Sequence, residues 1–301
     1  MGYLAKFPTV RNSTAGLVVF FCGYIAAAIT ALVFFNTPGT VLLFIACVLL
    51  AALLFMTLVF SVAWSLKRTD LVDVAWGIVF IVIAGVAWLL SEYSVQVGWN
   101  IQTIVALLVT VWGLRLAGTL LLRMWGRPED KRYVELRKKW RGNLLLNTYI
   151  RIFATQALLA VVISAAAIIV LASPPQQLGI YAYIGIGVWV IGFCFEVIGD
   201  LQLKRFIANP QNKGKVLSTG LWRYTRHPNY FGEATMWWGI FIIALSTYIG
   251  WLGVISPVII TFLLLFVSGV PMAEMALSKR NGWKEYTAKT SKFLPLPPKE
   301  V

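Results

Sequence analysis

Long apolar runs separated by short polar segments make up most of the chain. Eight runs come close to or exceed the roughly 20 residues that an α-helix needs to cross a bilayer core. The runs are Gly16–Phe35, Val41–Ser65, Val74–Leu90, Ile101–Leu122, Ile150–Leu171, Ile180–Leu201, Tyr230–Ser246 and Trp251–Val270. The pattern predicts an all-α, polytopic helix bundle with eight transmembrane helices. Because no polar stretch is long enough for a soluble domain, we expect a single membrane domain over residues 1–301.

The Lys and Arg residues lie in alternate connections between these runs. The connections around residues 36–40, 91–100, 173–179 and 246–250 contain none. By the positive-inside rule, both termini and every basic loop are expected to be cytoplasmic. The expected location is therefore a bacterial inner membrane, or the endoplasmic reticulum in a eukaryote. The net charge of +14 is explained by topology and by contact with membrane lipids, so it does not call for a nucleic-acid partner.

Cysteine and histidine usage excludes other classes of protein. Cys22, Cys47 and Cys194 all fall inside apolar runs, so a disulfide framework is not expected. His227 is the single histidine, which disfavours a metal site. The first apolar run is long and lacks a small-residue cleavage site, so we expect no cleavable signal peptide.

Ionisable residues inside membrane spans are costly and usually mark function. In this chain they gather near the cytoplasmic ends of the predicted helices, and only one acidic residue, Glu92, lies on the far side. The group comprises Arg115, Arg151, Glu196, Asp200, Glu233 and Glu274. A transporter would more often carry such groups near the midplane, so the pattern predicts a cavity open to the cytoplasm.

Glu196 and Asp200 are four residues apart and share one helix face, and Lys204 follows one turn later. Carboxylates can accept hydrogen bonds from ribose hydroxyls while cations hold phosphates, so the pattern suits a nucleotide. The structural alternative is a buried network in which Arg115 or Arg151 neutralises the two acids. The two interpretations can coexist.

The segment before Tyr230–Ser246 has the composition of an anion site. Pro228 fits the first turn of a helix, whose free N–H groups would lie near Arg223, Arg226 and His227. Asn229 and Glu233 are spaced to grip a carboxamide, which offers both a donor and an acceptor. The nearby aromatic residues belong to an interfacial belt or stack on a ligand ring, and His227 has a structural or a functional role. These aromatic residues include Trp222, Tyr224 and Tyr230.

Several motifs resemble the steroid 5α-reductase-like superfamily, most closely its bacterial-type branch. The motifs are Glu196-x-x-x-Asp200-x-Gln202, Asn212-Lys213-Gly214-Lys215, the stretch Gly220 to Glu233, Trp237-Trp238-Gly239, Ser268-Gly269, Glu274 to Tyr286 and Pro295. The similarity is greatest over residues 101–295. Weaker similarities are Asp73-x-x-Trp76-Gly77, Trp112-Gly113-Leu114-Arg115-Leu116 and Glu129-Asp130-x-Arg132-Tyr133.

This resemblance implies a cytoplasm-facing NADPH site. Asn229 and Glu233 would meet the nicotinamide, and Glu196 and Asp200 the ribose and diphosphate. The full set of implied cofactor-binding residues is Arg115, Glu196, Asp200, Lys204, Lys215, Trp222, Arg223, Tyr224, Arg226, His227, Asn229, Tyr230, Glu233, Glu274 and Tyr286. The Gln-Glu pair of the steroid reductases is absent. Asp70-Leu71-Val72-Asp73 stands in the comparable region, which argues against a 3-oxosteroid substrate.

We therefore expect a membrane-embedded, NADPH-dependent reductase of an activated carbon–carbon double bond in a steroid, isoprenoid or fatty substrate. Glu233 is a candidate catalytic residue, and Asp73 is a candidate proton donor or, alternatively, a helix cap or interhelix contact. One alternative is an S-adenosylmethionine-dependent methyltransferase of isoprenylcysteine or phospholipid type, since such enzymes carry a similar Arg-His-Pro-x-Tyr core. The other is a non-catalytic transporter or scaffold.

The charge distribution makes a testable prediction about topology. Single cysteines introduced at Arg137 and Lys213 should react only with reagents that reach the cytoplasm, and one at Gln176 only with reagents from the opposite side. The cysteines should be introduced into a chain from which Cys22, Cys47 and Cys194 have been removed. Labelling of Gln176 and Lys213 from the same side would contradict the eight-span arrangement.

Overall fold

The computed structural model describes residues 38–93 and 98–300, which are helical apart from turns and loops. Within these ranges there is no strand, and the only β-type pairing is an isolated bridge between Thr225 and Ser291. The chain divides into two compact units, Met1–Leu43 and Phe44–Val301. The packing described below lies within the second unit.

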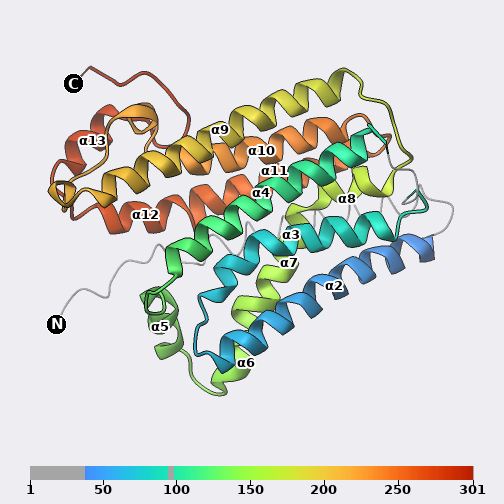
Figure 1. The fold of residues 1–301 in the computed structure, drawn as a ribbon, viewed down its shortest axis with the longest axis horizontal. Coiled ribbons are helices and arrows are strands. Elements are labelled where there is room, and N and C mark those ends of the chain that lie inside the picture. Colours follow the sequence, from blue (N-terminus) through green and yellow to red (C-terminus); the bar gives the residue numbers. More distant parts are fainter. Residues whose placement is uncertain (1–37, 94–97, 301) are drawn as a thin grey trace. The chain divides into compact units, whose positions relative to one another are not determined.

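The described residues form long helices with several local breaks (Figure 1). The first part contains α2 (Pro38–Ser65), α3 (Leu71–Leu89), α4 (Ile101–Met124), α5 (Lys131–Lys138), α6 (Leu144–Thr148), η1 (Tyr149–Ala154), α7 (Thr155–Ile163) and α8 (Ala165–Ala172). The second part contains α9 (Ile180–Ala208), η2 (Pro210–Asn212), η3 (Gly220–Arg223), α10 (Pro228–Ala244), η4 (Gly250–Val254), α11 (Ile255–Phe262), η5 (Leu263–Val267), α12 (Val270–Leu277) and α13 (Trp283–Lys289).

Six helical segments in the described part of the chain are long and apolar enough to cross a membrane. They are Val41–Ser65, Leu71–Leu89, Ile101–Met124, Leu144–Ile163, Ile180–Ala208 and Gly250–Leu277. The all-helical, multi-pass prediction is confirmed at this level. The predicted run Gly16–Phe35 lies outside the described residues. The predicted run Tyr230–Ser246 forms α10, whose 17 residues are at the short end of the range for a membrane span.

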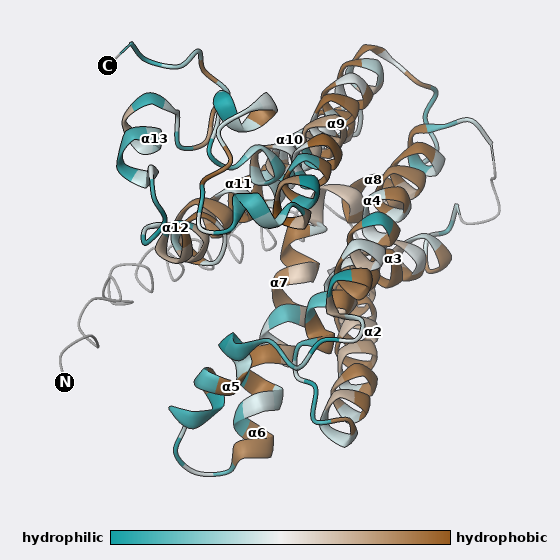
Figure 2. Cartoon of the chain, turned by 60° about the vertical axis from the view of Figure 1, so that its left-hand side comes forward, coloured by the Kyte–Doolittle hydropathy of each residue, from teal (hydrophilic) through white to brown (hydrophobic). Residues whose placement is uncertain are grey.

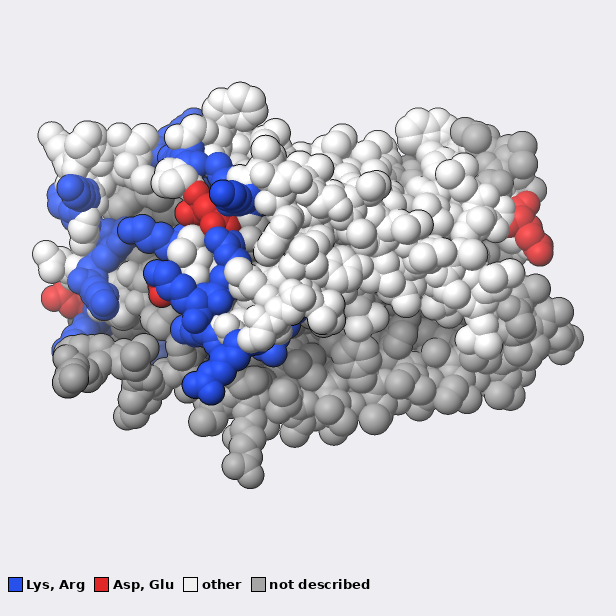
Figure 3. Space-filling view, turned by 90° about the horizontal axis from the view of Figure 1, so that it is seen from below, with Lys and Arg blue, Asp and Glu red and all other residues white. Residues whose placement is uncertain are grey.

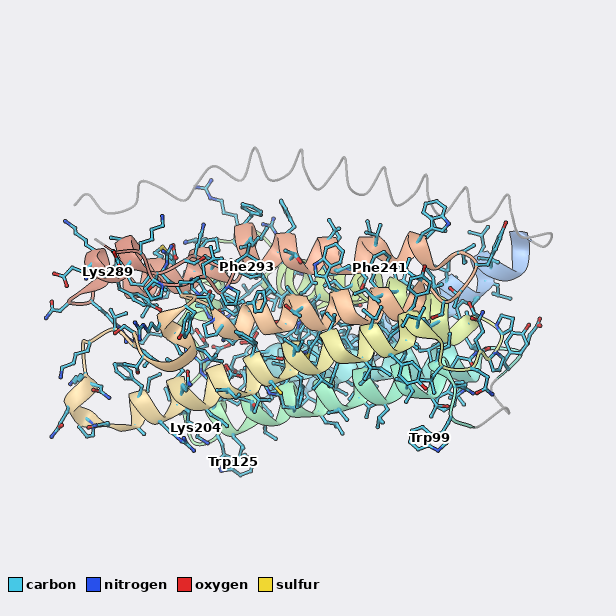
Figure 4. The ribbon with its side chains drawn as sticks, turned by 90° about the horizontal axis from the view of Figure 1, so that it is seen from above. Trp99, Trp125, Lys204, Phe241, Lys289 and Phe293 are labelled. Atoms are coloured by element: carbon cyan, nitrogen blue, oxygen red, sulfur yellow. The ribbon has the colours of Figure 1, made fainter. Side chains whose placement is uncertain are left out.

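Helix α4 shows how one span is delimited. Its N-terminus is capped by Asn100, whose side chain accepts a hydrogen bond of 2.9 Å from the backbone N–H of Thr103. Exposed indoles, Trp99 and Trp125, flank the helix and lie at its opposite ends (Figure 4). At 1.5 Å per residue, its 24 residues extend about 36 Å, which is enough to cross a hydrocarbon core. Indole rings favour the membrane–water interface, so their positions fit this assignment.

Glycines allow two helix pairs to pack backbone against backbone. On α3 and α4, a Cβ added to Gly77 would lie 2.4 Å from the carbonyl oxygen of Gly113. On α9 and α10, a Cβ at Gly192 would lie 2.6 Å from the carbonyl oxygen of Gly232, and one at Gly185 would lie 2.5 Å from that of Gly239. Small residues permit such close approach between helices in membranes. These contacts fix how α9 and α10, which run side by side, are registered against each other (Figure 1).

Charged residues gather at one end of the visible surface. Figure 3 shows Lys and Arg side chains with interspersed acids at that end, a broad uncharged surface beyond them, and an acidic side chain at the opposite end. Along the ribbon, polar colouring is concentrated in α5, α13 and the adjoining loops, whereas α2 and α9 are mainly apolar (Figure 2). The C-terminal halves of α4 and α9 and the start of α10 carry the candidate site.

The glycine contacts predict a position-specific effect on stability. Gly192→Ala should lower the free energy of unfolding by about 1–3 kcal/mol, because its Cβ cannot fit against α10 without moving backbone. Gly187→Ala is the matched control on the same helix, since a Cβ there would meet nothing within 4 Å. Thermal unfolding in detergent measures both. Equal melting temperatures for the two variants would contradict this account of the α9–α10 contact.

Candidate functional site

The close contact between α9 and α10 brings their carboxylates together. A Cβ added to Gly232 would lie 2.5 Å from the backbone nitrogen of Glu196, so Glu233 on α10 starts beside Glu196 on α9. Both residues are buried, with exposed fractions of 3% for Glu196 and 9% for Glu233. The acids of α9 and the acid of α10, which the sequence spacing placed on one face of each helix, therefore form one group.

Arg115 on α4 binds this group. Its guanidinium forms ion pairs with the carboxylates of Glu196 and Asp200, and the side-chain amide of Asn229 donates to Asp200 Oδ1 at 3.2 Å. Glu233 interacts electrostatically with Arg115 and Asp200. We call Arg115, Glu196, Asp200, Asn229 and Glu233 the carboxylate cluster. The buried ion-pair network considered from the sequence is present, with Arg115 pairing with both Glu196 and Asp200, although its single charge offsets only one of the two acids.

Several buried polar atoms at this cluster have no hydrogen-bond partner. Apart from Arg115 Nη1, whose contact is the ion pair with Glu196, they are Glu196 Oε2 on α9, Asn229 Oδ1 on α10 and Trp112 Nε1 on α4, one turn before Arg115. Buried polar atoms are nearly always hydrogen-bonded, so three unpaired atoms from three helices in one region need an explanation. Two of them are acceptors and one is a donor.

An aromatic layer lies on the apolar side of the cluster. Trp112 and Trp237 meet edge to face with ring centroids 5.3 Å apart, and Phe80 packs on both at 5.1 Å and 5.2 Å. Trp76 packs on Phe80 in turn. Trp237 is one helical turn beyond Glu233, so the transition from the carboxylates to the aromatic layer takes place within one turn of α10.

Asp73 lies at the start of α3 and is held by α5. It accepts a hydrogen bond from the hydroxyl of Tyr133 and one of 3.0 Å from Arg132 Nη2. Tyr133 is the buried residue of α5, and burial, followed by the charge of Asp73, raises its pKa above the usual value. The pairing of Tyr133 with Asp73 was not predicted from the sequence. The available signal was that Tyr133 is the aromatic residue on the short, otherwise mostly polar segment Lys131–Lys138.

Further ion pairs hold α5 against the start of α3. Arg137 Nη1 donates to Glu129 Oε1 at 2.6 Å and also binds the Thr69 hydroxyl, while the Thr69 backbone N–H donates to Glu129 at 2.7 Å. Although burial opposes it, the hydrogen bonds from Arg137 and Thr69 hold the pKa of Glu129 below its usual value. Arg68 and Asp70 form a second pair, with Nε 2.9 Å from Oδ1. These contacts fix the position of Tyr133.

Tyr230 connects the two regions electrostatically. Its hydroxyl interacts with the carboxylates of Glu233 and Asp200 and with the guanidinium groups of Arg132 and Arg123. The ring of Tyr230 also stacks on that of His227, with centroids 5.4 Å apart. Tyr230 therefore lies within electrostatic range of both the carboxylate cluster and Arg132, which holds Asp73.

Arg226 and His227 belong to an internal network. Arg226 donates to Glu274 Oε1 at 2.8 Å and to the backbone oxygen of Thr290 at 2.8 Å, and His227 Nε2 lies 3.4 Å from Glu274 Oε1. The side chain of Arg226 is 11% exposed. Its donors therefore bind protein groups, which differs from the expected position of Arg226 beside a phosphate.

Trp222 and Tyr286 complete this network. The hydroxyl of Tyr286 donates to the backbone oxygen of Trp222 at 2.6 Å, and Trp222 Nε1 donates to that of Gly199 at 3.1 Å. Thr225 bonds to the backbone oxygen of Phe293 at 2.8 Å. The C-terminal segment is thus fastened to the loop that precedes α10, and that loop to α9.

The remaining cofactor candidates are exposed. Lys204 and Lys215, like Arg223 and Tyr224 on and beside η3, are accessible at the surface. Figure 4 shows Lys204 on α9, on the same side of the view as Trp125. The structure therefore divides the predicted residues into the buried carboxylate cluster, the internal network of Arg226 and a set of exposed side chains. In the described ranges, no group of three or more His, Cys, Asp or Glu side chains is arranged to hold a metal ion.

His227 makes stability depend on pH. It lies just outside α10, and burial, opposed by Glu274, lowers its pKa from 6.5 to about 4. The unfolded chain therefore binds a proton at higher pH than the folded one, and stability is lost as the pH falls from 6.5 towards 4. The loss should reach about 2 kcal/mol at pH 5.

The melting temperature in detergent should therefore fall between pH 7 and pH 5, and His227→Gln should flatten that fall. Because His227 is the single histidine of the chain, no other imidazole contributes in this window. An equally steep fall in the variant would assign the pH dependence to the carboxylates instead.

Comparison with known proteins places the chain in a family without assigning its activity. An uncharacterized protein of Schizosaccharomyces pombe is 26% identical over 268 residues, covering 77% of this chain and 74% of the relative. No solved structure matches the chain significantly. Residues 59–290 match the family described as a protein of unknown function, DUF1295. The match covers every element from the last two turns of α2 to the end of α13, and the chain therefore belongs to the DUF1295 family.

Proposed function

We propose that this protein is an NADPH-dependent reductase of an activated carbon–carbon double bond in a lipid-like substrate. In this proposal eight helices cross the membrane, both termini are cytoplasmic, and the carboxylate cluster receives the cofactor from that side. The observation that carries the proposal is the set of three unpaired, buried polar atoms, Trp112 Nε1, Glu196 Oε2 and Asn229 Oδ1, around one arginine–carboxylate network. A polar ligand with both donors and acceptors would satisfy them.

The residues present fit the nicotinamide end of NADPH. A carboxamide offers two N–H donors and one carbonyl acceptor. Asn229 Oδ1 and the carboxylate of Glu233 can accept from the N–H groups, and Trp112 Nε1 can donate to an oxygen. The aromatic layer formed by Phe80, Trp112 and Trp237 supplies an apolar surface next to these groups.

The exposed cations fit the phosphates. Lys204, Lys215 and Arg223 are accessible, and Lys and Arg side chains form strong charge-assisted hydrogen bonds with phosphate oxygens. Arg226 is assigned a different role in this proposal, because its guanidinium is occupied by Glu274 and by backbone oxygens. It would hold the loop carrying Arg223 in place.

Bound NADPH would supply the hydride, so the protein must supply a proton to the other carbon of the double bond. We propose that this proton comes from the Asp73–Tyr133 pair, in which the Tyr133 hydroxyl donates a hydrogen bond to Asp73. Asp73 accepts the hydrogen bond from this hydroxyl, and Arg132 neutralises Asp73. We therefore propose that Asp73 positions Tyr133 and receives support from Arg132.

The resemblance to steroid 5α-reductases supports the reaction class more than the substrate. Asp70 and Asp73 stand where those enzymes are expected to carry a Gln-Glu pair, and both are engaged by arginines of this chain. The groups that would polarise a 3-oxosteroid are therefore replaced. A lipid-like substrate of another kind, isoprenoid or fatty, agrees better with these residues.

One observation favours a second candidate, an S-adenosylmethionine-dependent methyltransferase. The carboxylate cluster contains three acids and a single arginine. A sulfonium cation would offset part of this excess negative charge. The nucleotide that the protein binds therefore distinguishes the two functions.

The test is thermal unfolding of the purified protein in mild detergent with added nucleotides. NADPH at about a hundredfold excess over its dissociation constant should raise stability by about 2.7 kcal/mol, and NADH should have less effect at the same concentration. Glu233→Gln should weaken NADPH binding about tenfold or more, because the charge-assisted part of its hydrogen bond is lost. The melting temperature of the ligand-free variant should change little.

Glu135→Gln is the matched control. Glu135 is an exposed carboxylate on α5 that pairs with Lys138, so its neutralisation should leave NADPH binding unchanged. Stabilisation by S-adenosylmethionine and not by NADPH would replace the reductase proposal with the methyltransferase. If Glu233→Gln bound NADPH like the parent protein, Glu233 would be removed from the site.

A further inference from the structure

Arg151 is a cation within a membrane-spanning segment, and the described part of the chain provides no carboxylate partner for it. It lies in the segment Leu144–Ile163, and its side chain is exposed. Its guanidinium lies over the ring of Trp140, with the centroid 5.7 Å from Cζ. By contrast, Arg115 in the segment Ile101–Met124 has two carboxylate partners.

An exposed arginine at this position needs a counter-ion from outside the protein. A charged side chain is costly in hydrocarbon, and near a helix end it reaches for the headgroup region. Arg151 points back towards Trp140, which precedes the membrane-spanning segment and so lies on its polar side. The partner available at that level is the phosphate of a lipid headgroup.

The backbone around Arg151 departs from a regular α-helix. Arg151 lies in η1, a six-residue π-helical turn, and such turns often occur at functional sites. The Asn147 side chain donates to the backbone oxygens of Arg141 and Asn143 at 3.1 Å and 2.9 Å. Asn147 thereby ties the start of the span to the turn that carries Trp140 and Arg141. Arg141, whose backbone oxygen accepts from Asn147, is itself exposed, so a second arginine stands on the turn that is tied to the start of the span.

We infer that Arg151, Arg141 and Trp140 form a binding site for the headgroup phosphate of an anionic phospholipid. Two guanidinium groups suit a phosphate, because arginine forms strong, geometrically specific hydrogen bonds with its oxygens. The leucines at 144, 145 and 146, with exposed fractions of 40%, 45% and 52%, provide an apolar surface for the acyl chains. In Figure 2 the apolar colour of α6 lies beside the polar colour of α5, as a headgroup boundary requires.

This site shares no residue with the carboxylate cluster and does not depend on the proposed reductase. Anionic lipids are favoured over zwitterionic ones because each cation near a surface of negative lipids contributes to attraction. A choline headgroup carries its own cation and would meet Arg141 and Arg151 unfavourably. The expected ligand is therefore phosphatidylglycerol or another lipid with a net negative headgroup.

Native mass spectrometry of the protein released from detergent micelles tests the assignment. The parent protein should retain phosphatidylglycerol in preference to phosphatidylcholine, and Arg151→Gln should reduce that retention about tenfold. Arg151→Lys should restore part of it. Lys289→Gln is the control, because it removes an exposed cation from α13, and it should retain phosphatidylglycerol like the parent (Figure 4).

Folding of the variants is monitored by their melting temperatures, and Arg151→Gln should unfold like the parent because it loses no ion pair. Equal retention of the two lipids by the parent protein would overturn the inference. An equal loss of phosphatidylglycerol retention in Arg151→Gln and Lys289→Gln would also overturn it. If glycerol phosphate displaced the lipid at equal concentration, the site would be one for soluble phosphates and the lipid assignment would be wrong.

Discussion

The backbone contact between α9 and α10 is the constraint on which the polar centre of this protein depends. Gly185 and Gly192 on one helix meet Gly239 and Gly232 on the other at distances that leave no room for a Cβ. Because the helices are so close, side chains next to the contact are forced together whatever their charge. Glu196 and Glu233 are neighbours for this reason, and the glycines at positions 192 and 232 determine the depth at which they meet.

The carboxylates brought together in this way repel one another, and Arg115 of α4 offsets part of that repulsion. Arg115 supplies one positive charge to the acids of α9 and α10, and the glycine contact between α3 and α4 holds its helix in position. A buried ion pair is weak evidence for stability because its desolvation is costly. The arrangement is easier to understand as a preorganised polar surface in an apolar surrounding, with Trp112 and Trp237 excluding water on one side.

Much of the fold follows from local pattern, whereas the site depends on contacts between distant segments. The apolar runs predicted the long helices, because an α-helix is the way for a single segment to satisfy its backbone in lipid. The spacing of Glu196 and Asp200, and of Asn229 and Glu233, predicted which residues share a helix face. It could not predict that Asn229 would bond to Asp200, because that contact depends on the register of two helices.

The same limit explains the residues whose surroundings differed from expectation. Arg226 stands in a basic, aromatic motif, which suggested an anion site, but its partners Glu274 and Thr290 lie far along the chain. Tyr133 was overlooked because Asp73 is 60 residues away from it. The break at Ser164 between α7 and α8 was also not predicted, because the run around it is uniformly apolar.

The fastening of the C-terminal segment to the loop before α10 has a consequence for biosynthesis. Thr290, which binds Arg226, is translated 64 positions after it, so at ribosomal speeds about 3–13 s pass between the two. During that interval α10 is already synthesised, but Arg226 and His227 still lack the C-terminal groups that they contact. The loop and the tail must therefore close together late, after the last span has been delivered, and assembly of this end of the protein becomes the final step of its maturation.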